Sequence, residues 1–331
     1  AFSAHAGEGR YTIPLTGGGW SLWLDKEASW QNDRLYLPHE ITDLSLLPVN
    51  VPTGGWQTLS HNPDAVPVEV PGTVEEYLTV TDNPRPEHFR GVSWWYRKIK
   101  IPADQQEKRF IIYFESVRMR AEVYLDGKLV AYDLIGETPF HVDITDEAKP
   151  GTEQLLAIRV TNPGGNFHWQ DFDILKWGEY NIPPARSFSG IIGRVKLESV
   201  NPVFISDIYM QNTPELTKVN AIISFTNETL SSVKQNVELV VNEKANPDKV
   251  VFRQTLKNLS FPVGNREVTI PVNVPDAKLW DLSTPELYTC NVQIKKGKKT
   301  LDQDKKDFGF RWFTVDGIGK DAVLRLNGRR I

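Results

Sequence analysis

The sequence has one cysteine among its 331 residues, Cys290, so no disulfide can form within the chain. It has no apolar run that approaches the roughly 20 residues of a membrane-spanning helix. Its formal net charge is only −4, without the strongly basic face typical of nucleic-acid binding. These absences exclude an intrachain disulfide scaffold and argue against membrane or nucleic-acid partners.

The sequence also lacks the common signals of a metal or cofactor site. Its six histidines show no metal-ligand spacing. Gly17, Gly18 and Gly19 are not followed by the Lys-Ser/Thr of a phosphate-binding loop, so we interpret them as a flexible turn. Cys290 lies in an alternating β-type run, which favours a buried structural thiol over a nucleophile. We therefore expect no metal and no cofactor.

The opening residues, AFSAHAGEGR, contain no apolar signal-peptide region. If this start is a mature terminus, a periplasmic or extracellular location is favoured. A single cysteine does not indicate the redox compartment, so localisation stays open.

The sequence is rich instead in short β-prone runs and in tryptophan, with ten Trp in all. Such runs occur at residues 93–101, 109–115, 121–125, 128–132, 140–144 and 155–160. Asp126-Gly127 between two of them is a strong hairpin signal. Residues 1–70 contain many prolines and read as an irregular opening, with a short strand near residues 66–70. We expect an all-β, jelly-roll sandwich over residues 1–200.

A second domain is indicated after Asn201-Pro202, where we place the domain boundary. Short strands separated by turns recur over residues 201–313, which is typical of an immunoglobulin-like β-sandwich without a disulfide. Residues 314–331 resemble one hairpin with Asn327-Gly328 at its turn.

Several short motifs share their order and spacing with one known family. They are VPGT at 70–73, GVSWWYR at 91–97, VYLDGK at 123–128, FSGIIGRV at 188–195, LWDLSTPELY at 279–288, FGFR at 308–311 and LNG at 326–328. Together they resemble the non-catalytic front part of a family 2 glycoside hydrolase, the β-galactosidase, β-glucuronidase and β-mannosidase group. The resemblance covers the chain from about residue 70 onward; the opening residues depart from the family's short lead-in.

The resemblance implies a jelly-roll sugar-binding domain, an immunoglobulin-like sandwich and a TIM barrel with two catalytic glutamates in a retaining mechanism. Residues 314–331 would then begin a truncated barrel. The family's acid/base glutamate follows an asparagine, which draws attention to Asn227-Glu228 and Asn242-Glu243. Both pairs lie in or beside expected sandwich strands, so we predict no catalytic residue in this chain.

The segment between the last two jelly-roll strands holds the strongest candidates for sugar contact, because rings stack on sugar C–H faces and carboxylates accept hydroxyl bonds. They are Trp169, Asp171, Asp173 and Trp177. In some family members this segment reaches into the barrel's sugar pocket. The alternative is that the tryptophans pack at a domain interface and the aspartates cap turns.

His88 and Arg90 lie in a second polar loop, just before the Trp-Trp strand, and are candidates for the same pocket. The alternative is an exposed loop without a ligand.

Three functions remain open at this stage. The first is the N-terminal part of an exo-acting, retaining, β-galactosidase-like glycosidase, which completes the sugar pocket, supports the absent barrel and is inactive alone. The second is a free-standing carbohydrate-binding module. The third is a structural module that assembles a homo-oligomer. The expected partners are accordingly a β-glycoside, the missing barrel or further copies of the chain.

Overall fold

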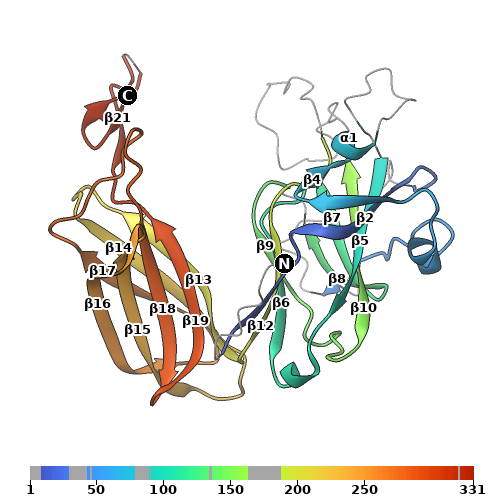
Figure 1. The fold of residues 1–331 in the computed structure, drawn as a ribbon, viewed down its shortest axis with the longest axis horizontal. Coiled ribbons are helices and arrows are strands. Elements are labelled where there is room, and N and C mark those ends of the chain that lie inside the picture. Colours follow the sequence, from blue (N-terminus) through green and yellow to red (C-terminus); the bar gives the residue numbers. More distant parts are fainter. Residues whose placement is uncertain are drawn as a thin grey trace. The chain divides into compact units, whose positions relative to one another are not determined.

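The computed structural model describes residues 9–29, 43–44, 47–78, 89, 91–133, 136–162, 188–319 and 321–331. These residues form antiparallel sheets with very little helix (Figure 1). They divide into two compact units, one of Thr12–Ser199 and the other of residues 9–11 with Val200–Ile331. The prediction of an all-β fold with two successive sandwiches is confirmed. The exact domain limits, and a separate third domain at 314–331, stay predictions.

The first unit, the jelly roll, packs a four-stranded sheet, in the order β1-β12-β6-β9, against a six-stranded sheet, in the order β3-β2-β5-β10-β7-β8. A two-stranded pair, β4 and β11, lies beside them. The strands are β1 (Tyr11–Pro14), β2 (Gly17–Asp25), β3 (Val66–Val70), β4 (Gly72–Thr73), β5 (Gly91–Lys100), β6 (Arg109–Phe114), β7 (Arg120–Leu125), β8 (Lys128–Asp133), β9 (Phe140–Asp143), β10 (Glu153–Asn162), β11 (Gly190–Ile191) and β12 (Val195–Val200). The helical turns are η3 (Trp56–Ser60), α1 (Val74–Tyr77) and η4 (Ala103–Gln105).

The six-stranded sheet is buried on both faces, which explains why β5 has six consecutive buried residues. Trp95 points into the main core between the two sheets, while Trp94 belongs to a second apolar cluster on the outer face. Trp56, Leu47 and Leu59, from the opening segment, cover that outer face. The proline-rich opening therefore serves partly as a third layer over the sheet.

One prediction for the opening segment was wrong. Gly17, Gly18 and Gly19 are not a free turn but the start of β2. The register of β2 against β3 shifts between Gly17 and Trp20, and Gly17 and Gly19 have φ of 92° and 86°. Only glycine adopts such values without strain, so the glycines supply a β-bulge that directs Trp20 into the core.

The second unit is a sandwich of a three-stranded sheet, β13-β14-β17, and a four-stranded sheet, β16-β15-β18-β19. Its strands are β13 (Val203–Asn212), β14 (Lys218–Asn227), β15 (Val233–Glu243), β16 (Asn246–Phe261), β17 (Gly264–Asn273), β18 (Tyr288–Lys296) and β19 (Lys299–Phe308). Alternate residues face one apolar core, and Cys290 is fully buried there, as predicted. Burial raises the pKa of its thiol to about 12.

Residues 9–11 belong to this second unit although they precede the jelly roll in sequence. Arg10 Nε and Nη2 donate to the buried Asp302 carboxylate at 3.0 and 2.9 Å, and Nη2 also donates to the carbonyl of Ile205. A Cβ on Gly9 would lie 2.2 Å from the carbonyl oxygen of Leu301, so this position requires glycine. Within the described residues, the chain therefore passes between the two units twice, near residue 11 and near residue 200.

The last strands, β20 (Phe313–Asp316), β21 (Val323–Leu326) and β22 (Arg329–Arg330), form a small sheet, the terminal sheet. Asn327 and Gly328 have φ of 51° and 81° at the turn between β21 and β22, which confirms the predicted Asn-Gly hairpin. No helix in the described part of the chain is long and apolar enough to cross a membrane.

Candidate functional site

The sequence-predicted sugar contacts are all outside the described residues. This holds for Trp169, Asp171, Asp173 and Trp177 in the segment 163–187, and for His88 and Arg90 in the second loop. The structure does describe the residues that flank these two segments in the chain. These attachment residues form the candidate site.

The two segments are attached at the same end of the six-stranded sheet. Asn162 is the last residue of β10, and it pairs with Gly91, the first residue of β5. Its fully buried side chain donates from Nδ2 to the carbonyl oxygen of Phe89 at 2.7 Å. The segment 163–187 thus begins directly beside the point where residues 79–88 end.

Glu75, in the first turn of α1, contacts the ends of both segments. Its Oε1 accepts a hydrogen bond from the backbone N–H of Phe89 at 3.1 Å, and its Oε2 accepts one from the N–H of Ser189 at 3.2 Å. Phe89 and Ser189 are both buried. One carboxylate therefore joins the end of the first segment to the end of the second.

The short helix is fixed by its own cap and by the strand before it. Thr73 caps α1 by accepting from the N–H of Glu76 at 3.2 Å, and the N–H of Val74 donates to the carbonyl of Ser189 at 2.7 Å. β4 and β11 pair through Thr73 and Gly190. A Cβ on Gly190 would approach the carbonyl oxygen of Gly72 to 2.3 Å, so the glycine permits this close pairing.

Arg118 adds a positive charge to this end of the jelly roll. Its backbone exchanges two hydrogen bonds with Gly190, at 2.8 and 2.7 Å, and its guanidinium lies 4.5 Å from the centre of the Phe188 ring. Burial lowers the pKa of this guanidinium, and the negative charge of Glu75 opposes that shift. The residues that follow the segment 163–187 therefore lie against a cation, Arg118, and an anion, Glu75.

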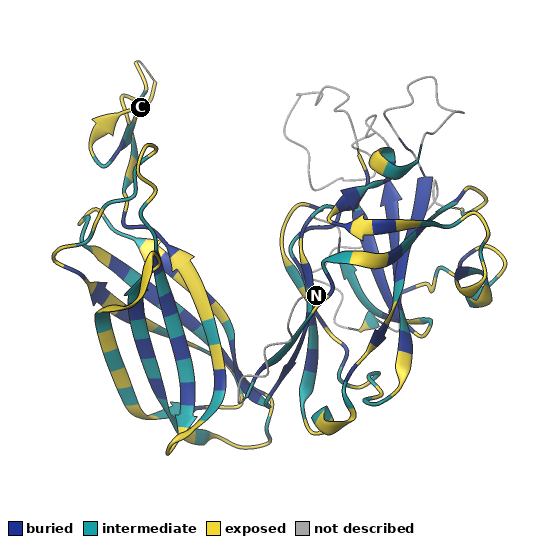
Figure 2. Ribbon diagram, in the orientation of Figure 1, coloured by how far each residue is buried: buried dark blue, intermediate teal, exposed yellow. Residues whose placement is uncertain are grey.

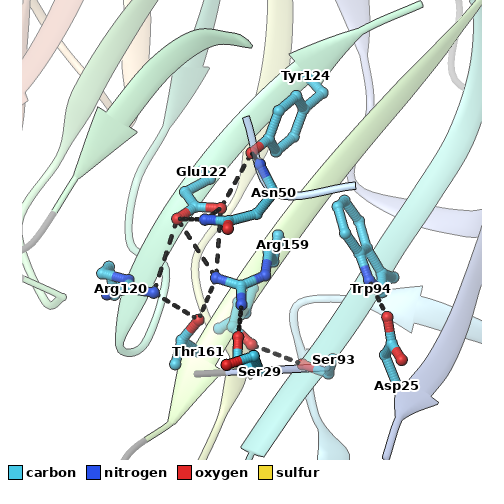
Figure 3. Close-up of polar contacts among 11 residues, drawn as sticks. Asp25, Ser29, Asn50, Ser93, Trp94, Arg120, Glu122, Tyr124, Arg159 and Thr161 are labelled. Atoms are coloured by element: carbon cyan, nitrogen blue, oxygen red, sulfur yellow. Dashed lines mark hydrogen bonds and ion pairs between the residues drawn. The ribbon is translucent and has the colours of Figure 1, made fainter. Parts of the chain in front are cut away.

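A second polar group, the Glu122 cluster, is buried on the outer face of the six-stranded sheet (Figure 3). Glu122 accepts from Asn50 Nδ2 at 2.8 Å and from the Tyr124 hydroxyl at 3.0 Å, and it lies 3.3 Å from Arg159 Nη1. Desolvation, and then the Glu122 charge, raise the pKa of Tyr124. Arg120 also lies within ion-pair distance of Glu122.

The Glu122 cluster has the geometry of a structural element. Its carboxylate is already held by two arginines, a hydroxyl and an amide, and Arg159 Nη2 donates to the carbonyl of Ser29 in the opening segment. A carboxylate whose oxygens are already bound by such partners is poorly placed to act as a nucleophile. Sequence reasoning missed this cluster; the available signal was the alternation of charged residues in 120–122 on a strand otherwise rich in buried residues.

The two Asn-Glu pairs lie in the second sandwich, as expected. Asn227 ends β14, with its side chain bonded to the carbonyls of Ser231 and Phe261. Glu243 ends β15, where a hydrogen bond from Lys249 lowers the pKa of its carboxyl. Within the described residues, no group of three His, Cys, Asp or Glu side chains could hold a metal ion.

Two protein-family models match the chain, one for each unit. The model described as "Glycosyl hydrolases family 2, sugar binding domain" matches residues 17–197. The model described as "Glycosyl hydrolases family 2" matches residues 203–311. The first of these alone covers more than half of the chain.

Individual relatives agree with the family models. A β-glucuronidase of Formosa agariphila is 26% identical over 303 residues, which cover 86% of this chain and 29% of that protein. A β-galactosidase of Thermoanaerobacter pseudethanolicus is 27% identical over 243 residues, or 73% of this chain and 31% of the relative. The chain thus spans about a third of the length of these relatives.

The fold also matches solved structures. A β-glucuronidase from glycoside hydrolase family 2 superposes with a TM-score of 0.67 at 21% identity, over 99% of this chain and 33% of that one. A putative β-galactosidase from Bacteroides fragilis gives a TM-score of 0.66 at 18% identity, over 98% of this chain and 44% of that one. At these identities the match concerns the fold.

Proposed function

The chain belongs to glycosyl hydrolase family 2, of which it forms the N-terminal sugar-binding and immunoglobulin-like part, and from this premise we propose that it completes the substrate pocket of an exo-acting, retaining β-glycosidase. In this proposal a catalytic barrel outside the 331 residues supplies the two glutamates. The names of the relatives support a β-galactoside or a β-glucuronide as substrate. The chain alone is then inactive.

This proposal rests on the hydrogen bonds that connect the residues flanking the two segments. Asn162 and Glu75 both bind Phe89, and Glu75 also binds Ser189, so both segments are attached at one end of one sheet. In this proposal Trp169 and Asp171 from one segment contact the same ligand as His88 from the other. Rings would then stack on the sugar, while charged groups bind its hydroxyls.

The terminal sheet supports the role in holding a barrel. The cross-strand pairs Phe313–Leu326 and Val315–Leu324 place four apolar residues on one face. Phe313, Val315 and Leu324 are 51%, 40% and 45% exposed, while the opposite face carries Thr314, Asp316 and Arg325 beside Val323. Such an exposed apolar face is typical of a surface that contacts another part of a protein, here the proposed barrel.

Hydrolysis assays test the catalytic part of the proposal. We expect the 331-residue chain to release no nitrophenol from nitrophenyl β-galactoside or β-glucuronide above a buffer blank. Turnover that survives repurification and is proportional to protein concentration would contradict it.

A free-standing carbohydrate-binding module is the second candidate, favoured by the sugar-binding-domain family model over residues 17–197. Calorimetry with the isolated chain separates the two. Tight, saturable binding that is lost in Trp169→Ala or Trp177→Ala supports the module, whereas weak binding that needs the barrel supports the pocket-completing role. The assembly alternative predicts an oligomer whose size rises with concentration, without sugar binding.

A further inference from the structure

We propose that one end of the second sandwich binds an anionic polysaccharide through lysine and amide side chains. This surface, the lysine end, lies on the four-stranded sheet where β15 begins and where β18 turns into β19. The inference rests on the proposed function only in taking a carbohydrate as the partner. The lysine end is made of Lys234, Lys257, Lys296, Lys298, Lys299 and Gln303.

The pairing of the strands brings these lysines together. Lys296 and Lys299 are opposite each other across the β18–β19 hairpin, and Lys298 lies in its turn. β18 is also paired with β15, which has Lys234 near its start at the same end of the sheet. Lys257 lies where the register of β16 against β15 shifts. Lysines from four neighbouring strands and one turn are thus gathered at one end of one sheet.

The positive charge of the lysine end is not compensated. Its five lysines are exposed, and within the described residues none of them forms an ion pair. The carboxylate on the outer face of this part of the sheet belongs to Glu238, which already pairs with Lys295 and Arg253. These two partners hold the pKa of Glu238 below its usual range, so it stays ionised and engaged. The exposed lysines are therefore available to an external anion.

The opposite end of the same sheet shows that this surplus is local. There Lys244 pairs with Asp307, and Lys249 pairs with Glu243. Lysine is therefore balanced by carboxylates at one end of the sheet and unbalanced at the other. Because salt screens exposed single charges, several clustered lysines suit a partner that repeats its negative charge along a chain.

The outer face beside the lysines has the chemistry to bind hydroxyl groups. Gln293 lies opposite Gln303 and donates to its amide oxygen at 3.3 Å. Each amide has both donors and an acceptor, so the pair retains groups for further hydrogen bonds. The described residues of β15, β18 and β19 on this face include no aromatic ring. Stacking is thus absent, which favours acidic sugars over neutral sugars and over nucleic-acid bases.

The test measures binding of polygalacturonate to the 331-residue chain by calorimetry and by retardation in native gels. One variant, Lys234→Ala with Lys298→Ala and Lys299→Ala, removes three charges from the lysine end. We expect it to bind about fivefold to tenfold more weakly than the wild type, the sum of three exposed charge contacts. Wild-type binding should itself weaken as the salt concentration rises.

The matched control is Lys98→Ala with Lys128→Ala and Lys218→Ala, which removes three exposed lysines from other parts of the chain. It changes the net charge equally and should bind within about twofold of the wild type. The thermal midpoint of each variant verifies that it is folded.

Poly-L-glutamate, which repeats a carboxylate but has no sugar hydroxyls, tests the amide part of the surface. The wild type should bind it more weakly than polygalacturonate. Gln303→Ala should weaken binding of polygalacturonate and leave binding of poly-L-glutamate unchanged.

Three results would overturn the proposal. They are no binding of polygalacturonate at low salt, an equal loss of affinity in both triple variants, and equal or tighter binding of poly-L-glutamate or duplex DNA. None of them bears on methyl β-galactoside or methyl β-glucuronide, whose binding is titrated separately, so the proposed function can stand when this inference fails.

Discussion

The two sandwiches share an architecture but use their sheets differently (Figure 2). In the jelly roll, β5, β7 and β10 are buried along most of their length, because protein covers both faces of the six-stranded sheet. In the second sandwich, β15 and β18 alternate between buried and less buried residues, as expected when one face meets water. The jelly roll thus has an extra layer over its larger sheet, whereas the second unit is a sandwich of two sheets around one core.

The largest expected loss of stability concerns the six-stranded sheet of the jelly roll, which is covered on both faces. Glu122→Ala leaves Arg159 and Arg120 buried without their anion, which should destabilise the jelly roll by about 3–5 kcal/mol. Urea unfolding followed by tryptophan fluorescence measures it. Glu215→Ala, which breaks the exposed pair with Lys218 in the second unit, is the control, with an expected loss of about 0.5 kcal/mol or less. Equal effects would contradict the contrast between the units.

The second prediction concerns the second sandwich. Leu239 is fully buried in its core, and Leu239→Ala should cost about 2–4 kcal/mol through lost burial and a cavity. Leu230 is fully exposed in a turn, and Leu230→Ala should stay within about 0.5 kcal/mol of the wild type. Calorimetric unfolding of both variants makes the comparison. A large effect at Leu230 would show that its turn is not simply solvent-exposed.

The third prediction uses the buried thiol of the second unit. Because burial raises the pKa of Cys290 from 9.0 to about 12, the unfolded chain loses this proton first as the pH rises. The thiol's contribution to stability should therefore hold below about pH 9 and fall by about 1.4 kcal/mol at pH 10. The difference between the wild type and Cys290→Ala across that range isolates it. Rapid alkylation of the folded chain at pH 8 would contradict the burial.

The smallest stability effect is expected on the terminal sheet. Phe313→Ser with Leu324→Ser changes two half-exposed side chains, so the free energy of unfolding should fall by less than about 1 kcal/mol. Their effect should appear instead in binding of the fluorescent probe ANS, which the wild type should bind more strongly. Thr314→Ala on the opposite face is the control. A large loss of stability would mean that these side chains already pack within the unit.

Local patterns in the sequence predicted much of this fold. The Asp126-Gly127 hairpin, with φ of 48° and 84°, and the strand Val66–Val70 are both present. These features depend on neighbouring residues alone. The bulged start of β2 was missed, since a run of glycines fits both a turn and a bulge.

The Glu122 cluster and the Glu75 link were not predicted, because Asn50 and Arg159 are distant in the chain from Glu122, and Ser189 is distant from Glu75. Charged residues alternating on a strand normally indicate that one face of the strand meets water. Here the opening segment covers that face, so the charged side chains are buried. Glu75 lies on a helix of four residues, and its two donors come from two other parts of the chain. The predicted sugar contacts themselves lie outside the described residues and stay predictions.

Because residues 9–11 belong to the second unit, although Thr12–Ser199 form the first, cleavage by a protease between the units should not separate them. A single cut at Asn201-Pro202 would divide the polypeptide into two pieces, yet residues 9–11 of the first piece would remain inserted in the second unit through the buried Arg10–Asp302 pair. The nicked protein should therefore migrate as one species under native conditions and as two bands after denaturation. A second sandwich prepared without residues 9–11 would lack Arg10, the ion-pair partner of the buried Asp302, unless those residues were supplied in trans.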